Sequence, residues 1–236
     1  MKKIFYLIVL LIISSHGYSQ TAEWYFQRGD GKFSIKDYKS AIFCYTKALE
    51  INPKYTDGYF YRGIAYEKSK NYKAAIADYQ KVIELNPKDV GAYFNRGNVK
   101  LFYMKDFIGA IADFTKAVEF NVDFAEAYGN RGNAKSNIQD YQGAISDFTR
   151  MIEINPKSAG AYSNRGNVYE KIKSYNSAIA DFTKCIEINP KDSWSYFRRG
   201  RIKITSGQKE GGCNDLNKAA ELGYTKAFED IKEFCK

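Results

Sequence analysis

Five arginines, each followed at a nearly constant interval by an aspartate, form the clearest chemical pattern in the sequence. The pairs are Arg62 and Asp78, Arg96 and Asp113, Arg131 and Asp147, Arg165 and Asp181, and Arg199 and Asp215. A guanidinium can bind a carboxylate through two parallel hydrogen bonds, so each pair could form a salt bridge. The alternative is a row of arginines that face a ligand. Because the acid recurs in five copies, the structural salt bridge is the favoured interpretation. A sixth arginine, Arg28, has Cys44 where the acid would stand.

The only histidine is His16, close to the N-terminus. A Ser-His-Asp or Cys-His catalytic arrangement needs an imidazole base, and most zinc sites other than all-cysteine ones use imidazole ligands. The sequence also has no glycine-rich phosphate-binding loop. It therefore predicts no catalytic residues, no metal and no cofactor, and an enzyme is the least favoured functional class.

The arginines belong to a repeat that covers nearly the whole chain. Each stands directly before one of six glycines, which lie 34 or 35 residues apart at Gly29, Gly63, Gly97, Gly132, Gly166 and Gly200. A tyrosine lies four residues before every one of these glycines. A period of this length is typical of a solenoid, in which copies of one structural unit stack on each other.

One copy contains two predicted helices. In the fifth copy, Ala178, Ile179, Phe182 and Ile186 give the second helix an apolar stripe. Pro190 then ends this helix, because proline cannot continue the hydrogen-bond ladder.

These residues resemble the tetratricopeptide repeat, as it occurs in exported bacterial proteins. The family's alternation of aromatic and small residues is matched by Tyr162, Gly166, Tyr169, Ala178, Phe182, Cys185 and Pro190. The resemblance implies an all-α fold, a right-handed superhelical α-solenoid of six helix pairs with a C-terminal capping helix. The repeats would span about 22–55, 56–89, 90–124, 125–158, 159–192 and 193–224, and the capping helix 225–236. Each glycine would let the first helix of a pair approach the second closely, opposite Ala41, Ala75, Ala110, Ala144 and Ala178.

The third copy departs from this pattern. It has one extra residue between Asn98 and Asp106, and Val122 stands where proline is expected. We expect a local change of superhelix pitch there.

The resemblance also implies a binding groove lined by the first helix of each pair. It places six asparagines on that wall: Asn95, Asn98, Asn130, Asn133, Asn164 and Asn167. A carboxamide offers a donor and an acceptor together, so it can bind the backbone of an extended peptide. The alternative, that these asparagines make local hydrogen bonds, stays open.

Aromatic and basic residues extend the same predicted wall. Phe60, Phe94 and Phe197 could be partner contacts, or could pack between neighbouring repeats. Arg198 and Arg201 resemble part of the carboxylate clamp of some family members, but Gly129 and Trp194 stand where that clamp has lysines. A solvated basic end is the favoured interpretation of the two arginines.

The first nineteen residues resemble a signal peptide in their order: two lysines, an apolar run, then small and polar residues. Cleavage after Ser19 is expected, and ten apolar residues are too few for an uncleaved membrane anchor. The mature chain would then be periplasmic or extracellular, with no transmembrane span. Its formal net charge would fall from +9 to +7, because the leader carries two lysines and no acid. The remaining charges are scattered, so nucleic acid is not expected as a partner.

Four cysteines remain after the leader. In an oxidising compartment Cys213 and Cys235, both near the C-terminus, are predicted to form a disulfide. The alternative is four reduced thiols. Cys44 and Cys185 are expected to stay unpaired.

The sequence thus favours an exported scaffold that binds a peptide or another protein in its groove. The first alternative is a constitutive structural subunit of a cell-envelope complex, and nucleic-acid binding ranks behind both. The sequence does not specify the oligomeric state.

Overall fold

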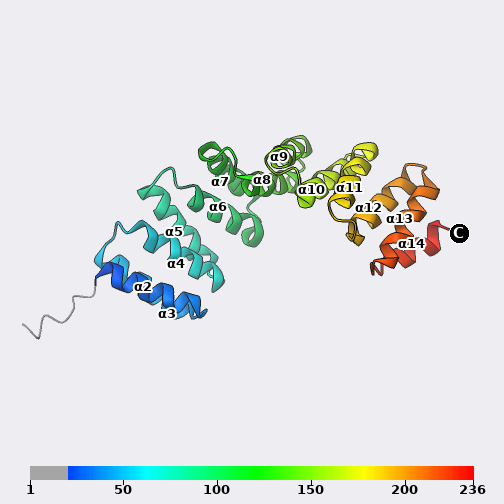
Figure 1. Ribbon diagram of the computed structural model, residues 1–236. Helices are drawn as coiled ribbons and strands as arrows, with labels where there is room; N and C mark the ends of the chain where they lie inside the picture. The colour runs from blue at the N-terminus through cyan, green and yellow to red at the C-terminus, as the bar shows by residue number, and fades with distance from the viewer. Residues whose placement is uncertain (1–20) are drawn as a thin grey trace, which may run out of the picture. The chain divides into compact units, whose positions relative to one another are not determined.

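The computed structural model describes residues 21–236. These residues form two compact units, which divide between Ala92 and Tyr93. They contain thirteen α-helices and one short π-helix, and no strand is found among them (Figure 1). The predicted all-helical array of twelve repeat helices and a capping helix is therefore confirmed. The predicted leader, residues 1–19, lies outside the described part of the chain.

The first unit contains two complete helix pairs. The pairs are α2 (Ala22–Ser34) with α3 (Tyr38–Ile51), and α4 (Thr56–Lys68) with α5 (Tyr72–Leu85). Helix α3 also packs on α4, so the two pairs are stacked. Helix α6 (Val90–Val99) begins in this unit and continues in the second.

The second unit continues the same pattern to the C-terminus. It contains the π-helix η1 (Lys100–Met104), α7 (Phe107–Phe120), α8 (Ala125–Asn137), α9 (Tyr141–Ile154), α10 (Ala159–Lys171), α11 (Tyr175–Ile188), α12 (Ser193–Thr205), α13 (Lys209–Glu221) and α14 (Ala227–Phe234). Each helix from α7 to α14 packs on the next one along the chain. We call the first helix of each pair helix A and the second helix B.

The turn between helix A and helix B has a recurrent backbone conformation. Six of the seven described residues with positive φ lie there, at Lys36, Lys70, Lys105, Gln139, Lys173 and Gly207, and the seventh, Gly223, follows α13. In four pairs the residue after this position caps helix B, as when the Asp140 carboxylate accepts from the Gly143 N–H at 3.0 Å. Such a side chain satisfies a backbone donor that the helix itself leaves free, and so fixes where helix B begins.

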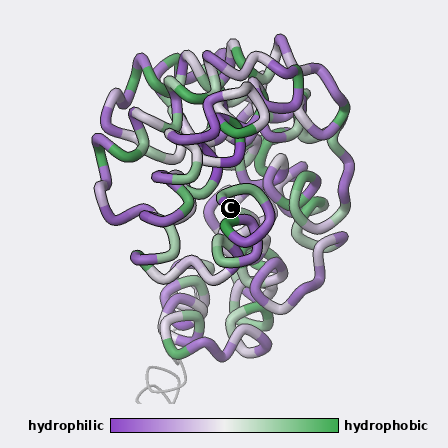
Figure 2. Tube along the Cα trace, turned by 90° about the vertical axis from the view of Figure 1, so that its right-hand side faces the viewer, coloured by the Kyte–Doolittle hydropathy of each residue, from purple (hydrophilic) through white to green (hydrophobic). Residues whose placement is uncertain are grey.

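The contact between the two helices of a pair lies at the repeated glycine. A Cβ placed on Gly132 would lie 2.9 Å from Cε1 of Phe148, on helix B of the same pair. Tyr45, Tyr79 and Phe114 occupy the same place in earlier pairs. The alanines expected opposite the glycines are fully buried, and in the first four pairs the atoms nearest to such a Cβ belong to an aromatic ring of helix B. Figure 2 shows hydrophobic and hydrophilic segments alternating along the helices, as one buried face per helix requires.

The extra residue of the third repeat is accommodated as a π-helix. In η1 the ladder widens, and the Asp106 N–H donates to the Lys100 carbonyl at 2.9 Å. Leu101 is buried, whereas Phe102, Tyr103 and Met104 are exposed. Helix α7 still ends at Phe120 although no proline follows. The change of superhelix pitch expected here stays a prediction.

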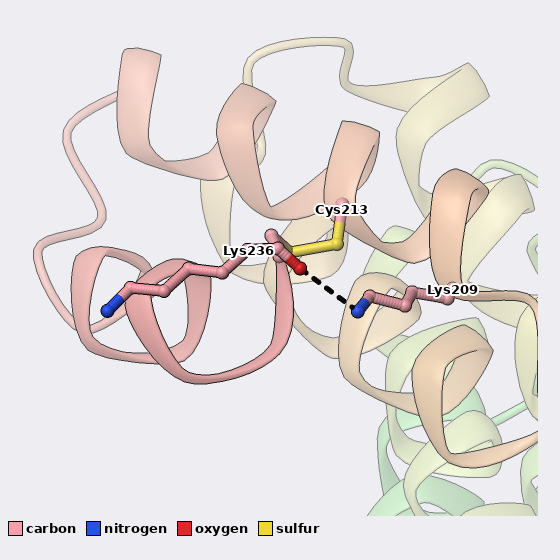
Figure 3. Close-up of a disulfide and its surroundings, with 4 residues drawn as sticks. Lys209, Cys213 and Lys236 are labelled. Atoms are coloured by element: carbon pink, nitrogen blue, oxygen red, sulfur yellow. Dashed lines mark hydrogen bonds between the residues drawn. A yellow bond between two sulfur atoms is a disulfide. The ribbon is translucent and has the colours of Figure 1, made fainter.

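The last helix covers the end of the sixth repeat. Ala227 of α14 is fully buried in a cluster with Phe197, Leu216 and Ala219. Figure 3 shows the disulfide that joins Cys213 of α13 to Cys235, which follows α14, with the two Cα atoms 5.6 Å apart. Nearby, the Lys209 ammonium donates to the backbone carbonyl of Lys236 at 3.3 Å. That the Cys213–Cys235 disulfide forms in the protein's own compartment stays a prediction.

Candidate functional site

All five predicted Arg–Asp pairs form salt bridges between helix A and helix B. Each guanidinium binds both carboxylate oxygens of its aspartate, and the Nη2–Oδ1 distances are 2.5–2.8 Å. The five aspartates are buried. The interpretation as structural salt bridges is therefore confirmed, and these arginines are not available to a ligand.

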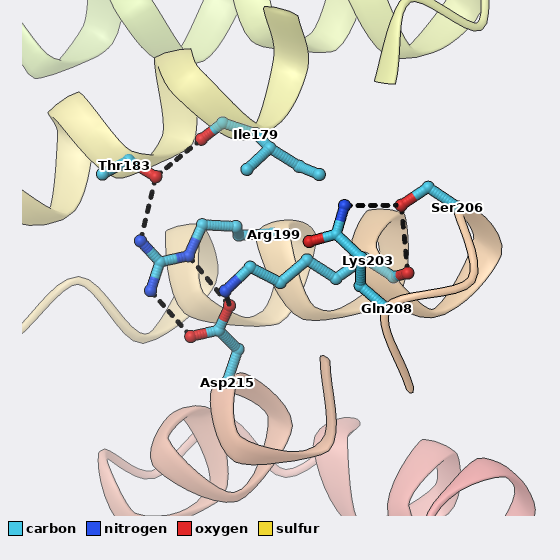
Figure 4. Close-up of polar contacts among 7 residues, drawn as sticks. All are labelled: Ile179, Thr183, Arg199, Lys203, Ser206, Gln208 and Asp215. Atoms are coloured by element: carbon cyan, nitrogen blue, oxygen red, sulfur yellow. Dashed lines mark hydrogen bonds and ion pairs between the residues drawn. The ribbon is translucent and has the colours of Figure 1, made fainter. Parts of the chain in front are cut away.

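A third residue extends four of these bridges to the preceding repeat. In Figure 4, Arg199 binds Asp215 and also donates to the Thr183 hydroxyl on the preceding helix B, at 3.0 Å. Thr46, Thr115 and Thr149 accept in the same way from Arg62, Arg131 and Arg165. One side chain thus connects three helices of two repeats.

The recurrent tyrosine belongs to the same cluster. The guanidinium carbon of Arg131 lies 5.3 Å from the ring centroid of Tyr128, and the other four arginines lie 5.5–5.8 Å from theirs. A cation over an aromatic face is attracted by the negative face of the ring. In repeats two to six, the tyrosine four residues before the glycine therefore has a packing and electrostatic role.

The second unit has a groove of about 580 Å³ on its helix A side. Its wall comes from α8, α10 and α12, with Phe148 of α9 also contributing. Four of the sequence-predicted residues line it: Asn133, Asn164, Asn167 and Arg198. Trp194, which the sequence also placed on this wall, lies with them.

The asparagines of the groove have unused hydrogen-bonding capacity. The side chains of Asn133, Asn164 and Asn167 are half-buried, and none of the hydrogen bonds within residues 21–236 involves them. Each carboxamide therefore still offers two N–H donors and an acceptor oxygen toward the groove.

Two of the three charged residues that line the groove are paired with each other. Arg198 forms an ion pair with Glu170 of the preceding repeat, and its guanidinium lies over the Trp194 ring at 5.3 Å. The Lys171 ammonium donates to the Ser136 hydroxyl at 3.2 Å. The groove therefore presents neutral carboxamides beside one ion pair, Arg198 with Glu170, and the positive charge of Lys171.

The other predicted asparagines do not line this groove. Asn98 and Asn130 bind each other, with the Asn130 amide donating to the Asn98 carboxamide oxygen at 2.8 Å. This is the local hydrogen bonding that the sequence left open as the alternative. Asn95 also lies outside the residues that line the groove.

The predicted aromatic contacts lie in packed positions. Phe94 packs on Phe114 of α7 and on Phe124, which directly precedes α8, with ring centroids 5.9 and 4.5 Å apart. Phe60 contacts Tyr79 and lies against Gly91. Phe197 is only 6% exposed. We therefore do not include the three phenylalanines in the site.

The basic end of the wall is paired as well. Arg201 Nε lies 3.2 Å from the Asp230 carboxylate of α14. With Arg198 held by Glu170, neither arginine offers the unpaired cation that a carboxylate clamp would need.

Sequence reasoning missed the residues one helical turn beyond the asparagines. Ser136 and Asn137 follow Asn133 in this way, and Glu170 and Lys171 follow Asn167. Residues three or four apart share a helix face, so this spacing is the signal that could have found them.

Residues 21–236 hold no group of three histidine, cysteine, aspartate or glutamate side chains placed to bind a metal ion. None of the helices in this range combines the length and apolar character that a membrane span needs. Burial raises the pKa of the Cys185 thiol to about 11, which makes it a poor nucleophile.

Sequence models of the repeat match much of the chain. One tetratricopeptide repeat model matches residues 56–89 and 159–192. A second tetratricopeptide repeat model matches residues 125–158, and a TPR repeat model matches residues 29–70. Together they cover more than half of the sequence. The chain belongs to the tetratricopeptide repeat family. Members of this family are typically not enzymes, and they bind peptides or other proteins.

Solved structures of tetratricopeptide repeat proteins are similar to this chain. The crystal structure of MamA protein is 28% identical, with a TM-score of 0.69, over 73% of this chain and 93% of that one. YrrB, described as "a TPR protein with an unusual peptide-binding site", is 20% identical, with a TM-score of 0.69, over 80% and 97%. A tetratricopeptide repeat protein from Parabacteroides merdae is 21% identical, with a TM-score of 0.68, over 90% and 96%. The similarity to YrrB and to the Parabacteroides merdae protein shows the fold alone. No protein of curated function matches the sequence.

Proposed function

We propose that this tetratricopeptide repeat protein is an exported, non-catalytic scaffold that binds an extended segment of another protein in the groove of its second unit. The observation that carries the proposal is the set of unpaired carboxamides of Asn133, Asn164 and Asn167 in a groove of about 580 Å³. A carboxamide can bind the N–H and C=O of an extended backbone at once, which suits a segment with no secondary structure of its own. The peptide-binding site described for YrrB, which shares the fold, supports the same kind of ligand.

The Arg198–Glu170 ion pair limits the kind of peptide segment that the groove can bind. Arg198 and Lys171 are each held by a neighbouring side chain, so a terminal carboxylate would have to displace Glu170 or do without an arginine. An internal, extended segment bound through its backbone therefore fits better than a free C-terminus.

A photo-crosslinking experiment in the native host tests the proposal. A benzophenone amino acid replaces Asn137, which is exposed at the groove, and in a matched variant replaces Asn176, which is exposed on helix B of the fifth repeat. We expect a discrete crosslinked partner from position 137 and none from position 176. The same partner from both positions, or from neither, contradicts binding in the groove.

The alternative function, a constitutive subunit of an envelope complex, predicts a different result. A constitutive subunit would remain in fixed stoichiometry with its partners after a pull-down with high-salt washing. A groove that binds segments reversibly would lose them.

Export is proposed from the sequence of the leader. Mass spectrometry of the protein from its host should show a chain that begins at Gln20, after cleavage behind Ser19. An intact N-terminus in the cytoplasmic fraction would contradict it.

A further inference from the structure

The first repeat has the arginine of the recurrent salt bridge but not its acid. Arg28 stands directly before Gly29 on α2, where Arg62, Arg96 and the later arginines stand in their repeats, and Cys44 replaces the aspartate on α3. No ion pair of Arg28 occurs within residues 21–236.

The acidic residues near Arg28 have other partners. Glu23 accepts hydrogen bonds from the Tyr55 hydroxyl and the Gln27 amide. Asp30 accepts from the Tyr45 hydroxyl at 2.7 Å. The sequence before Glu23 contains no aspartate or glutamate, so the preceding residues cannot supply the missing carboxylate either.

A cavity lies beside the unpaired guanidinium. It has a volume of about 620 Å³, and its lining includes Trp24, Arg28, Lys32, Lys39, Phe43 and Cys44. The Arg28 guanidinium lies over the Trp24 ring at 5.2 Å, which holds it at the wall of the cavity. Trp24 and Phe43 are 39% and 60% exposed, so the cavity also has accessible apolar surface.

Lys32 occupies the position of a lysine that takes part in the salt-bridge cluster of other repeats. In the third, fourth and sixth repeats, the lysine four residues after the arginine makes a further ion pair with the same aspartate, at 2.8 Å for Lys100, Lys135 and Lys203. Lys32 stands four residues after Arg28 and has no such aspartate. The cavity thus has the two cations that bind a carboxylate elsewhere in the chain, with Lys39 as a third positive charge.

We propose that this cavity binds the carboxylate of an acidic peptide segment from another protein. Arg28 would bind both oxygens, as the other five arginines bind their aspartates, and Lys32 would add the second ion pair. Trp24 and Phe43 would contact an apolar residue next to the acid. The three positive charges provide the charge complementarity that selects an acidic partner. This site lies in the first unit and is independent of the groove in the second.

A fluorescence-anisotropy titration with a model peptide tests the proposal. The probe is a fluorescein-labelled decapeptide of alternating aspartate and phenylalanine, and its counterpart has asparagine at every aspartate. We expect the acidic peptide to bind at least on the order of ten-fold more tightly than the amide peptide. We expect Arg28→Gln to remove this difference, because it removes the guanidinium that binds the carboxylate. The variant should keep its fold, because Arg28 is exposed and makes no ion pair within residues 21–236.

Three matched variants decide whether the difference comes from this cavity. Lys54→Gln removes one positive charge from an exposed loop and should leave binding unchanged. Asn164→Ala with Asn167→Ala alters the groove and should leave the difference in affinity between the acidic and the amide peptides unchanged, because the groove carboxamides do not select for an acid. Cys44→Asp restores the missing acid and should raise the Tm and abolish tight binding, because Arg28 would then be occupied from within the chain.

Three results would overturn the proposal. The first is equal affinity for the acidic and the amide peptides. The second is acidic-peptide binding that survives both Arg28→Gln and Cys44→Asp. The third is tighter binding of a phosphoserine version of the peptide, which would assign the cavity to phosphate and not to carboxylate.

Discussion

At the scale of single residues, one arginine per repeat determines how neighbouring elements are held. In repeats two to six it binds an aspartate on helix B of its own repeat, and in four of these it also binds a threonine hydroxyl on the preceding helix B. The aspartates are buried, so the loss of an arginine partner would leave a charge away from water. This differs from the exposed pairs three residues apart on each helix B, such as Lys184 with Glu187.

The difference between the two kinds of ion pair can be measured. Asp181→Ala removes the acceptor of a buried pair, and we expect it to lower the free energy of unfolding by about 3–5 kcal/mol. Glu187→Ala removes one partner of an exposed pair, with both side chains more than half exposed, and should cost about 0–1 kcal/mol. Urea unfolding of the two variants provides the comparison. Equal losses would mean that the buried network does not stabilise the array.

At the scale of the elements, the helix pairs depend on the close approach of helix A to an aromatic ring of helix B. Gly132 allows this approach because a Cβ there would lie within 3.2 Å of three atoms of the Phe148 ring. Gly160 lies on a helix A in a neighbouring repeat, and a Cβ there would meet nothing within 4 Å. The two glycines therefore form a matched pair.

Gly132→Leu should destabilise the array, and Gly160→Leu should not. The first substitution forces the Phe148 ring or the helix backbone to move, at a cost of about 1–3 kcal/mol or more. The second places a side chain in open space at the start of a helix. Thermal unfolding followed by circular dichroism measures both, and similar melting temperatures would mean that the packing face is assigned incorrectly.

The final helix supports a further prediction about the cysteines. Helix α14 has only eight residues, and the Cys213–Cys235 disulfide closes a loop with a sequence separation of 22. A crosslink over such a loop stabilises by roughly 3 kcal/mol, which is enough to hold a short terminal helix. We expect reduction to loosen α14 selectively.

Peptide mapping without reductant measures the state of the four cysteines. We expect a linked peptide containing Cys213 and Cys235, and slow alkylation of the two buried thiols, since burial raises the pKa of Cys185 to about 11. Free thiols at positions 213 and 235, in protein taken from its native compartment, would contradict the bond.

The helices could be predicted from the sequence because their periodicity and their ends repeat six times. The backbone at the turns could not, because positive φ falls on residues such as Lys70 and Lys173, which carry no glycine signal. The π-helix was also missed: one inserted residue shows that the chain must adapt, but not where the hydrogen-bond ladder will widen.

The site could be predicted only in part, for a related reason. The helix face of the asparagines followed from the repeat, but whether a carboxamide is free depends on the neighbouring repeat. Asn130 finds Asn98 at hydrogen-bonding distance, whereas Asn164 finds no such partner. The packing of the phenylalanines likewise depends on rings that lie far away in the sequence, as Phe94 contacts Phe114 on helix B and Phe124 directly before α8.

At the scale of the whole molecule, most of the strong charge chemistry serves the array itself. The buried arginines connect repeats, and the arginines at the groove and beside the cap are paired with acids. What remains for an extended ligand in the second unit is a set of neutral carboxamides beside the ammonium of Lys171. The protein should therefore bind its partner through backbone hydrogen bonds that depend little on the partner's sequence.

Calorimetric titration of the chain with the segment captured from the groove tests this account most directly. Asn164→Ala combined with Asn167→Ala should raise the Kd by on the order of ten-fold, because two carboxamides that bind the ligand are lost. Asn130→Ala removes a carboxamide that binds Asn98 and lies outside the groove, so its Kd should stay within about two-fold of the unaltered chain. Both variants should keep their helicity. An unchanged Kd for the double variant, or an equal loss in both, would contradict recognition by the groove asparagines.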